Sequence, residues 1–414
     1  MTISFHTLGC KLNFAESSSL GRELLRRGHR RVAQGEAADV CVLNTCSVTE
    51  AADHKGRQAI HRLRRQYPDA VIIVTGCYAQ LKPHEILTMP EVDYVLGMNE
   101  KFSIPDFVDR LEQKTSQLYT SDIRRVRHFS PSYSSDDRTR CFLKIQDGCD
   151  YFCTYCTIPY ARGRSRNADV ASTVALARQA LDEGAKELVL TGVNIGDFGK
   201  STGETFIDFL HALDALQGDF RVRISSCEPN LLTDEIIEFV ANSRHFAPHF
   251  HIPLQSGSNE VLRIMRRRYT RELFEERVVK IKSLMPHAFI GVDCMVGVRG
   301  EIEKFFQDYL QFIESLPVSQ LHVFTYSERA GTRMLQMPLY VVPQKERKRR
   351  SDIMHAVSQE KLELFYQQHK GMTATVLWES KREADMMYGF TENYIKVSRP
   401  YDKSKVNTFE EIII

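Results

Sequence analysis

The sequence predicts an α/β protein in three parts: an N-terminal open parallel sheet, a central partial barrel of six β/α units, and a small C-terminal all-β barrel. Apolar strand-like runs alternate with helix-length amphipathic stretches over residues 1–97 and again over 140–327, whereas residues 371–414 hold only short strand-like runs. The 414 residues exceed a single hydrophobic core. We therefore expect domains at 1–130, 139–369 and 370–414.

The first part has a βαβαβ order. Its expected strands are Ile3–Gly9, Val40–Thr45 and Ala70–Gly76, and its expected helices are Phe14–Gly28 and Glu50–Tyr67. Parallel strands joined by helices end at a common edge of the sheet. Cys10, Cys46 and Cys77 each directly follow one strand, so we expect them to form a three-thiol site in the crevice at that edge. The alternative is three unrelated buried cysteines, which is our expectation for Cys41, Cys141, Cys227 and Cys294.

A connector should follow this part. A helix is expected over Phe102–Leu118, and the polar, basic stretch 124–140 has the composition of a loop. We place a domain boundary near residues 130–139.

The expected barrel strands occupy 141–146, 187–191, 220–226, 249–254, 289–296 and 320–326. Six units predict a partial barrel, because a complete eight-stranded barrel needs about 250 residues. Barrel enzymes carry their active sites at the carboxyl ends of the strands. A basic helix is expected after the barrel, from Pro343 to His369, and short strands are expected at Thr373–Trp378, Met387–Gly389 and Tyr394–Val397.

Cys149, Cys153 and Cys156 form a C-x3-C-x2-C run just after the first barrel strand. Three thiolates are one ligand short of a closed zinc or iron–sulfur site, so the run predicts a cluster with one iron open to a small molecule. Cys153 and Cys156 alone would also fit a thioredoxin-like dithiol, and Cys149 with a distant histidine could complete a zinc site.

This run, with Tyr155 before its third cysteine, resembles the radical S-adenosylmethionine (SAM) superfamily. The stretches Thr7–Asn13, Asn44–Thr49 and Thr75–Gln80 resemble the three cysteine motifs of the methylthiotransferase N-terminal domain. The resemblance implies two [4Fe–4S] clusters, one on each set of three cysteines, and makes all six cysteines catalytic. It also implies SAM as cofactor and a radical SAM fold for the partial barrel. By the same resemblance, SAM contacts come from Tyr155, Gly192, Asn194, Ser226, Glu228 and Gln255.

The opening Leu8–Lys11 most resembles the subgroup that methylthiolates C2 of N6-threonylcarbamoyladenosine at tRNA position 37. Sister branches act on isopentenyladenosine in tRNA or on ribosomal protein S12. In the family mechanism one SAM methylates a sulfide on the auxiliary cluster, and a second yields the radical that attacks the unreactive C2. From the residues alone, a non-catalytic Fe–S protein that binds RNA remains an alternative.

The formal charge of +2 is small, but basic residues cluster. Phosphate contacts are expected from two stretches. They are Arg263, Arg266, Arg267 and Arg268, and Lys345, Arg347, Lys348, Arg349 and Arg350. The tail resembles a short TRAM domain, an RNA-binding module, although residues 371–414 hold six Lys or Arg and seven Asp or Glu, a net −1.

The remaining expectations concern partners, location and one loop. The resemblance implies the tRNA anticodon stem-loop as a partner, and an electron donor such as flavodoxin or ferredoxin. No long apolar run or signal segment is visible, and ten cysteines suit metal ligation, so we expect a cytoplasmic protein, monomeric and without a membrane partner. Val298 and Arg299 stand where the family has phenylalanine and proline, which should loosen that loop.

Overall fold

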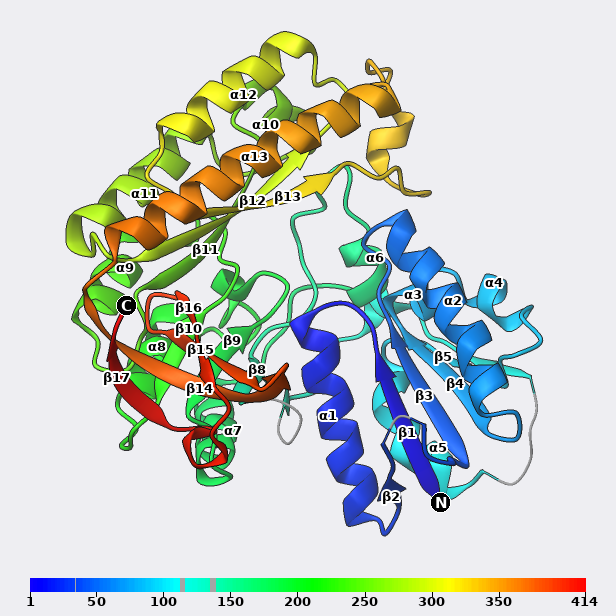
Figure 1. Ribbon diagram of the computed structural model, residues 1–414. Helices are drawn as coiled ribbons and strands as arrows, with labels where there is room; N and C mark the ends of the chain where they lie inside the picture. Colours follow the sequence, from blue (N-terminus) through cyan, green and yellow to red (C-terminus); the bar gives the residue numbers. More distant parts are fainter. Residues whose placement is uncertain (34, 112–115, 135–138) are drawn as a thin grey trace.

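The computed structural model describes residues 1–414 except 34, 112–115 and 135–138. The N-terminal part is a six-stranded sheet, wholly parallel, in the order β2-β1-β3-β4-β5-β6 (Figure 1). Its strands are β1 (Thr2–Thr7), β2 (Arg30–Arg31), β3 (Val40–Thr45), β4 (Val71–Gly76), β5 (Tyr94–Leu96) and β6 (Gln117–Tyr119).

Helices cover both faces of this sheet. The core on one face includes residues of α1 (Lys11–Arg26) and α5 (Ile104–Asp109). The core on the other includes residues of α2 (Glu50–Gln66), α3 (Cys77–Leu81) and α4 (Pro83–Leu87). β3 and β4 are buried on both faces, which explains their continuous apolar sequence.

The prediction of one helix over Phe102–Leu118 is wrong. In its place the structure has the 3₁₀ helix η1 (Glu100–Ser103), the short helix α5 and the edge strand β6, and residues 112–115 lie outside the described part. The strand β5 was not expected either. Three-residue strands are too short for a recognisable period, so the paired neighbour decides them.

The central part contains the six expected strands in chain order. They are β8 (Arg140–Lys144), β9 (Glu187–Thr191), β10 (Arg221–Ile224), β11 (His249–Gln255), β12 (Phe289–Val296) and β13 (Gln320–Thr325). β8, β9 and β10 form one parallel group and β11, β12 and β13 another, and two isolated bridges, Val222–Phe246 and Ser226–His251, join them. The unexpected strand β7 (Ser132–Tyr133) pairs with β8 antiparallel.

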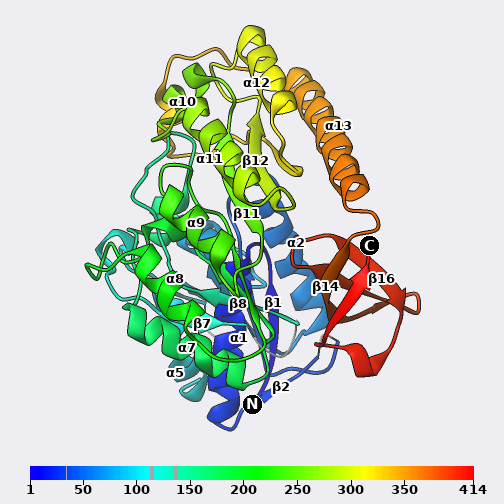
Figure 2. The ribbon, with the colours of Figure 1, turned by 90° about the vertical axis from the view of Figure 1, so that its left-hand side faces the viewer.

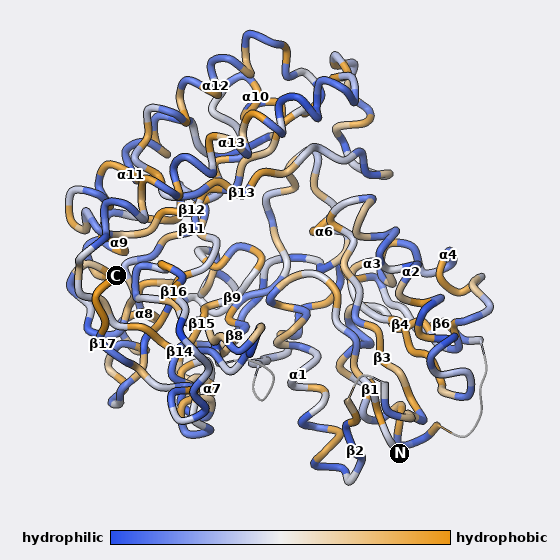
Figure 3. Tube along the Cα trace, in the orientation of Figure 1, coloured by the Kyte–Doolittle hydropathy of each residue, from blue (hydrophilic) through white to orange (hydrophobic). Residues whose placement is uncertain are grey.

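Helices cover the outside of this partial barrel. They are α7 (Val170–Asp182), α8 (Phe206–Asp214), α9 (Asp234–Asn242), α10 (Asn259–Met265), α11 (Arg271–Leu284), α12 (Glu303–Ser315) and α13 (Gln344–Gln368). The short helix α6 (Ile158–Arg162) lies instead between the barrel and the N-terminal part, where it packs against α3. Hydrophilic and hydrophobic residues alternate along these helices, as amphipathic packing requires (Figure 3). Further 3₁₀ helices are η2 (Ile123–Arg125), η3 (Ile195–Asp197), η4 (Arg333–Gln336) and η5 (Lys403–Lys405).

The first turns of α1 pack against the inner face of the barrel. Phe14 and Ala15 form a small core with Phe142 of β8 and Val189 of β9. Their strand neighbours, such as Leu143, belong instead to the large core on the helix side. Because side chains alternate between the two faces of a strand, the start of α1 points into the open side of the barrel.

The C-terminal part is a four-stranded antiparallel sheet in the order β16-β15-β14-β17. Its strands are β14 (Thr373–Glu383), β15 (Met386–Thr391), β16 (Lys396–Pro400) and β17 (Phe409–Ile413). The sheet curls into a half-barrel around Val376, Trp378 and Met387 and stands beneath the end of α13 (Figure 2). The strand β17 was not expected from the sequence.

Buried arginines dock this sheet on the barrel. Arg221 donates to the carbonyl oxygens of Thr375 and Phe390, at 3.1 and 2.7 Å, and Arg223 donates to those of Thr391 and Glu392. Both arginines also pair with the fully buried Glu187 on β9. Within the described residues, no helix combines the length and apolar character needed to cross a membrane.

Candidate active site

The loop after β8 brings Cys149, Cys153 and Cys156 together. Gly148 opens it with φ +72°, and a Cβ there would lie 2.0 Å from the carbonyl oxygen of Arg164. Backbone N–H groups of Tyr151 and Ile158 donate to the sulfurs of Cys149 and Cys156, each at 3.4 Å. Such bonds favour the thiolate form that a metal requires.

Burial raises the pKa of the Cys149 thiol to about 12 and also raises those of Cys153 and Cys156, and charges on neighbouring cysteines of the set add to the rise at Cys149 and Cys156. These thiols therefore ionise only when a cation replaces their protons. No group of three His, Cys, Asp or Glu in the described part of the chain is placed to hold a single metal ion. In an iron–sulfur cubane each thiolate binds a different iron, which suits a set of three cysteines.

Arg267 lies beside this set of cysteines. Its Nη1 donates to the sulfur of Cys153 at 3.1 Å and reaches the hydroxyl of Tyr155 at 3.5 Å, while Nη2 pairs with Glu228. Its side chain is 4% exposed. The expectation that Arg267 holds an RNA phosphate is therefore wrong, because its guanidinium is enclosed and already bound to a carboxylate.

Gln146 links the loop after β8 to the loop after β9, and no sequence pattern singled it out. Its Oε1 accepts from the N–H groups of Val193 and Asn194, each at 2.9 Å, and its Nε2 donates to the carbonyl oxygen of Gly148 at 2.7 Å. A Cβ on Gly192 would lie 2.9 Å from that same Oε1. Only glycine lets the second loop approach this closely.

The residues expected to contact SAM follow successive barrel strands. Asn194 follows β9, Ser226 and Glu228 follow β10, and Gln255 ends β11 with φ +64°. Two of their buried oxygens, Asn194 Oδ1 and Gln255 Oε1, have no hydrogen-bond partner within the described structure. Buried acceptors without a donor are costly, and both suit a polar ligand at this rim.

Cys10, Cys46 and Cys77 meet at the carboxyl edge of the N-terminal sheet. Cys10 caps α1, Cys46 follows β3 and Cys77 begins α3. A Cβ on Gly9, at φ +99°, would lie 2.4 Å from the Cβ of Cys46, so these two loops touch. Burial raises the pKa of Cys46 to about 12, with Cys77 and Cys10 adding to the rise.

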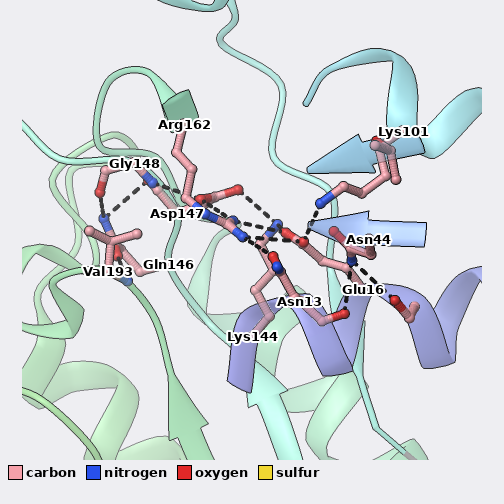
Figure 4. A network of polar contacts seen from close by, with 12 residues as sticks. Asn13, Glu16, Asn44, Lys101, Lys144, Gln146, Asp147, Gly148, Arg162 and Val193 are labelled. Atoms are coloured by element: carbon pink, nitrogen blue, oxygen red, sulfur yellow. Dashed lines mark hydrogen bonds and ion pairs between the residues drawn. The ribbon is translucent and has the colours of Figure 1, made fainter. Parts of the chain in front are cut away.

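A buried ionic network links α1, which follows Cys10, with the loop that carries Cys149, Cys153 and Cys156 (Figure 4). Arg162, six residues after Cys156, donates to Glu16 of α1 at 3.0 Å, to Asp147 at 2.9 Å and to the Oδ1 of Asn13 at 2.6 Å. Lys101 and Lys144 also bind Glu16, at 2.7 and 2.8 Å. Burial raises the pKa of Cys77 and the charge of Arg162 opposes that rise, so this cation acts on the second set.

The two basic stretches divide into exposed and buried residues. Arg263, Arg266, Arg268, Lys345, Lys348 and Arg349 are exposed. Arg347 and Arg350 are buried, because Arg347 donates to the carbonyl oxygens of Val342 and Tyr326, and Arg350 pairs with Glu301. The expectation that Arg347 and Arg350 hold phosphates is therefore wrong.

The unusual pair Val298 and Arg299 is well packed. Val298 is fully buried in a small core that includes Met265 and Met334. Arg299 pairs with Glu328 at 2.9 Å, on the segment after β13. Side-chain contacts of Val298 and Arg299 therefore hold this loop in place. A proline at position 299 would instead restrict the backbone of the loop.

Two family models match the chain. Residues 2–97 match Uncharacterized protein family UPF0004, and residues 143–313 match the Radical SAM superfamily. Among solved structures, the radical SAM methyltransferase TsrM from Kitasatospora setae aligns over 78% of this chain and 72% of its own, with a TM-score of 0.58. At 13% identity this likeness shows the shared fold alone.

Proteins of named function are similar over nearly the whole chain. "Threonylcarbamoyladenosine tRNA methylthiotransferase MtaB" of Bacillus subtilis is 39% identical over 96% of this chain and 90% of its own length. Its namesake in Aquifex aeolicus is 36% identical over 96% and 97%. "tRNA-2-methylthio-N(6)-dimethylallyladenosine synthase" of Desulfitobacterium hafniense is 30% identical over 98% and 93%. The chain therefore belongs to the radical SAM methylthiotransferases, enzymes that work with two [4Fe–4S] clusters and SAM.

Proposed function

We propose that this enzyme adds a methylthio group to C2 of N6-threonylcarbamoyladenosine at position 37 of tRNA. The observation that carries the proposal is the pair of three-cysteine sets, with one buried network through Arg162 linking α1, which follows Cys10, to the loop that carries Cys149, Cys153 and Cys156. Chemistry at an inert carbon needs both sites at a fixed separation. The name and 39% identity of the Bacillus subtilis relative support the choice of substrate.

In this proposal each set of cysteines holds one cluster. Cys149, Cys153 and Cys156 leave one iron open for SAM, and Cys10, Cys46 and Cys77 leave one open for sulfur. When bound, the clusters and SAM supply the radical and the methylthio group, which side chains alone cannot supply.

The chain's own residues position these groups. Glu228, held by Arg267, and the free oxygens of Asn194 and Gln255 would bind the polar end of SAM. Tyr155 and Arg267 close the side of Cys153, which keeps water from that sulfur. Gly192 and Ser226 leave room for a ligand at the rim, because neither residue has a large side chain.

The tRNA base must leave its stacked loop to reach a site between the cysteine sets. For phosphate contacts we now propose the exposed cations Arg263, Arg266, Arg268, Lys345, Lys348 and Arg349. We further propose domains at 1–130, 139–369 and 370–414, a cytoplasmic monomer, and flavodoxin or ferredoxin as electron donor.

The test is nucleoside mass spectrometry after anaerobic incubation of reconstituted protein with SAM, reductant, sulfide and hypomodified tRNA. The expected product is the 2-methylthio derivative of threonylcarbamoyladenosine. Product on dimethylallyladenosine alone would refute the proposed substrate. So would a parallel incubation with ribosomal protein S12, followed by protein mass spectrometry, in which S12 gains mass while the tRNA does not. Deoxyadenosine without any methylthio product would refute the transfer step.

A further inference from the structure

The strands β11, β12 and β13 present two different faces. Ile252, Val292 and Leu321 lie in the large core on the helix side. The residues between them face the barrel interior, because side chains alternate along a strand. On that inner face His251, Asp293, Met295 and His322 are partly exposed and Phe324 is exposed. In Figure 1 the helices α11, α12 and α13 lie on the other side of these strands, and the exposure of the inner side chains shows that solvent reaches this polar face.

A histidine pair occupies the middle of this face. His251 donates from Nε2 to Asp293 at 2.7 Å, which fixes its ring. The ring of His322 lies 5.0 Å from that of His251, at 62° to it. Gly291 makes room for it, because a Cβ there would lie 3.2 Å from His322 Nε2. Within the described residues the imidazole of His322 has no hydrogen-bond partner.

Lys11 faces the same space from the N-terminal sheet. It begins α1, and Phe14 and Ala15, one turn later, pack on the inner face of the barrel. The residue is accessible to solvent, yet the protein around its ammonium is dense enough that burial lowers its pKa, and Arg140 and Arg223 lower it as well. Within the described residues this ammonium makes no hydrogen bond or ion pair. Burial lowers the pKa of His322. The charge of His251 lowers it further, that of Asp293 raises it, and that of Lys11 lowers it, so Lys11 lies within electrostatic reach of the pair.

This arrangement leaves a cation and an imidazole without partners beside the cysteine site, as far as the described residues extend. The carboxylate that the inner face of β11–β13 does hold, Asp293, is already engaged by His251. An anionic ligand would satisfy Lys11 and His322 together, whereas a neutral apolar ligand would leave both unsatisfied.

We propose that Lys11 and His322, beside the Asp293-held His251, bind the free carboxylate of the amino-acid group on the target adenosine. This inference rests on the proposed function and deepens it, because it names the residues that select a threonylcarbamoyl group over an uncharged one. Discrimination arises because a site built for a charged group strongly rejects an analogue that lacks it. Phe324 and Met295 supply an apolar wall beside this carboxylate site.

The test compares two synthetic anticodon stem-loops: one carries threonylcarbamoyladenosine, and the other carries its threonine amide, in which a neutral carboxamide replaces the carboxylate. Binding to cluster-loaded protein is measured by fluorescence anisotropy, and KM and kcat by product formation. The parent protein should bind the acid about tenfold to a hundredfold more tightly than the amide. Lys11→Gln and His322→Asn should each lose most of this preference, chiefly in KM, and Lys11→Arg should retain part of it.

Lys55→Gln is the matched control, since Lys55 is an exposed lysine on α2 in the same part of the chain. It should keep the full preference. Because Lys11 follows Cys10, iron content and visible absorption must show that Lys11→Gln still holds both clusters. His322→Asn tests the same site at a residue distant in sequence from every cysteine ligand.

Three outcomes would overturn the inference. The parent protein could bind acid and amide alike, or both variants could keep the preference, or Lys11→Gln could weaken acid and amide equally, which would assign Lys11 to a backbone phosphate. Product formation separates the two claims. A parent protein that makes the methylthio product but ignores the carboxylate keeps the proposed function, and one that makes no product loses both.

Discussion

At the scale of single residues, Arg162 has the most consequential position in the molecule. It belongs to the short helix after Cys149, Cys153 and Cys156. Its guanidinium nevertheless binds Glu16 and Asn13 of α1, the helix that follows Cys10. Its side chain is 1% exposed. Breaking a buried ion pair by removing one partner is costly, because the other charge stays behind without solvent.

Replacing Arg162 by methionine should lower the free energy of unfolding by about 3–5 kcal/mol, since Glu16 and Asp147 would each lose a buried partner. Arg164→Met is the matched control two residues later. Arg164 is 54% exposed and pairs with Asp150, so its loss should cost less than about 1 kcal/mol. Chemical denaturation of both variants at equal iron content measures the difference, and equal losses would contradict the argument.

Glu16 also predicts a pH dependence. Burial alone would raise its pKa, but Arg162, Lys101 and Lys144 together hold it well below its usual value. A carboxyl with a lowered pKa stabilises the fold above its unfolded pKa, about 4.3, and loses that contribution as the pH falls toward the folded value. The stability gap between parent and Glu16→Gln should therefore be constant from about pH 5.5 to 7 and shrink below about pH 4.3.

Denaturation curves at several pH values check this expectation. Glu23→Gln, a partly exposed change on the same helix, serves as the control and should leave the pH profile of the parent nearly unchanged. A gap that widens toward acid would show that Glu16 is not held ionised by its three cations.

At the scale of elements, the site depends on loops that only glycine permits. Gly9 and Gly28 make a natural comparison, since both have positive φ, +99° and +85°. A Cβ on Gly9 would collide with Cys46, whereas a Cβ on Gly28 meets nothing within 4 Å. Backbone strain is thus common to both positions, and only Gly9 adds a collision beside the second cysteine set.

Gly9→Ala should separate the loops of Cys10 and Cys46 and reduce the iron bound by the second set to a small fraction. Overpacking of this kind costs about 1–3 kcal/mol beyond the backbone strain. Gly28→Ala should show the strain alone and keep both clusters. Iron measurement with electron paramagnetic resonance after anaerobic reconstitution distinguishes the two variants, and full iron content in Gly9→Ala would contradict this interpretation of the loop.

The elements also show how far the fold could be predicted from the sequence. Long buried strands such as Val40–Thr45 and the six barrel strands were predicted, because continuous apolar runs bounded by loops are distinctive. Strands β5, β6 and β7 have two or three residues and no period of their own. These short segments become strands only because they pair with neighbouring strands. Predicting them would have required the tertiary structure.

The candidate site divides in the same way. Cys149, Cys153 and Cys156 were predicted from their spacing, and Cys10, Cys46 and Cys77 because each follows a strand whose end the fold brings to a common edge. Arg267 was misassigned because its neighbours Arg266 and Arg268 look equivalent in sequence, and only the structure shows that Arg266 ends α10 in a left-handed conformation, φ +59°. Arg267 is enclosed while the arginines on either side remain exposed. Gln146 gave no signal, because its role depends on backbone groups of a different loop.

At the scale of the whole molecule, polar contacts hold three structural parts together. Arg329, after β13, reaches the N-terminal part and binds Asp53 at 2.7 Å and Ser47 at 2.8 Å, just beyond Cys46. Arg221 and Arg223 hold the C-terminal sheet by its carbonyl oxygens. Directional donors of this kind fix the orientation of the parts more strictly than apolar contact does.

Arg223→Met should loosen the C-terminal sheet, because it removes two donors to that sheet and one partner of the buried Glu187. Limited trypsin digestion should then release the tail at residues 370–373 several times faster than in the parent protein. Arg244→Met, a change on the same side of the barrel that leaves the tail contacts intact, should digest at the parent rate. Equal release in both variants would show that other contacts hold the sheet.

The link between Glu16 and Arg162 also has a consequence for biosynthesis. The two residues are 146 positions apart in the chain. At about 5–20 residues per second, a ribosome needs roughly 7–30 s to make the second after the first. Throughout that interval Glu16 can pair with Lys101 but lacks Arg162. The ionic contacts between α1 and the loop after β8 therefore form only after the first barrel strand has been synthesised.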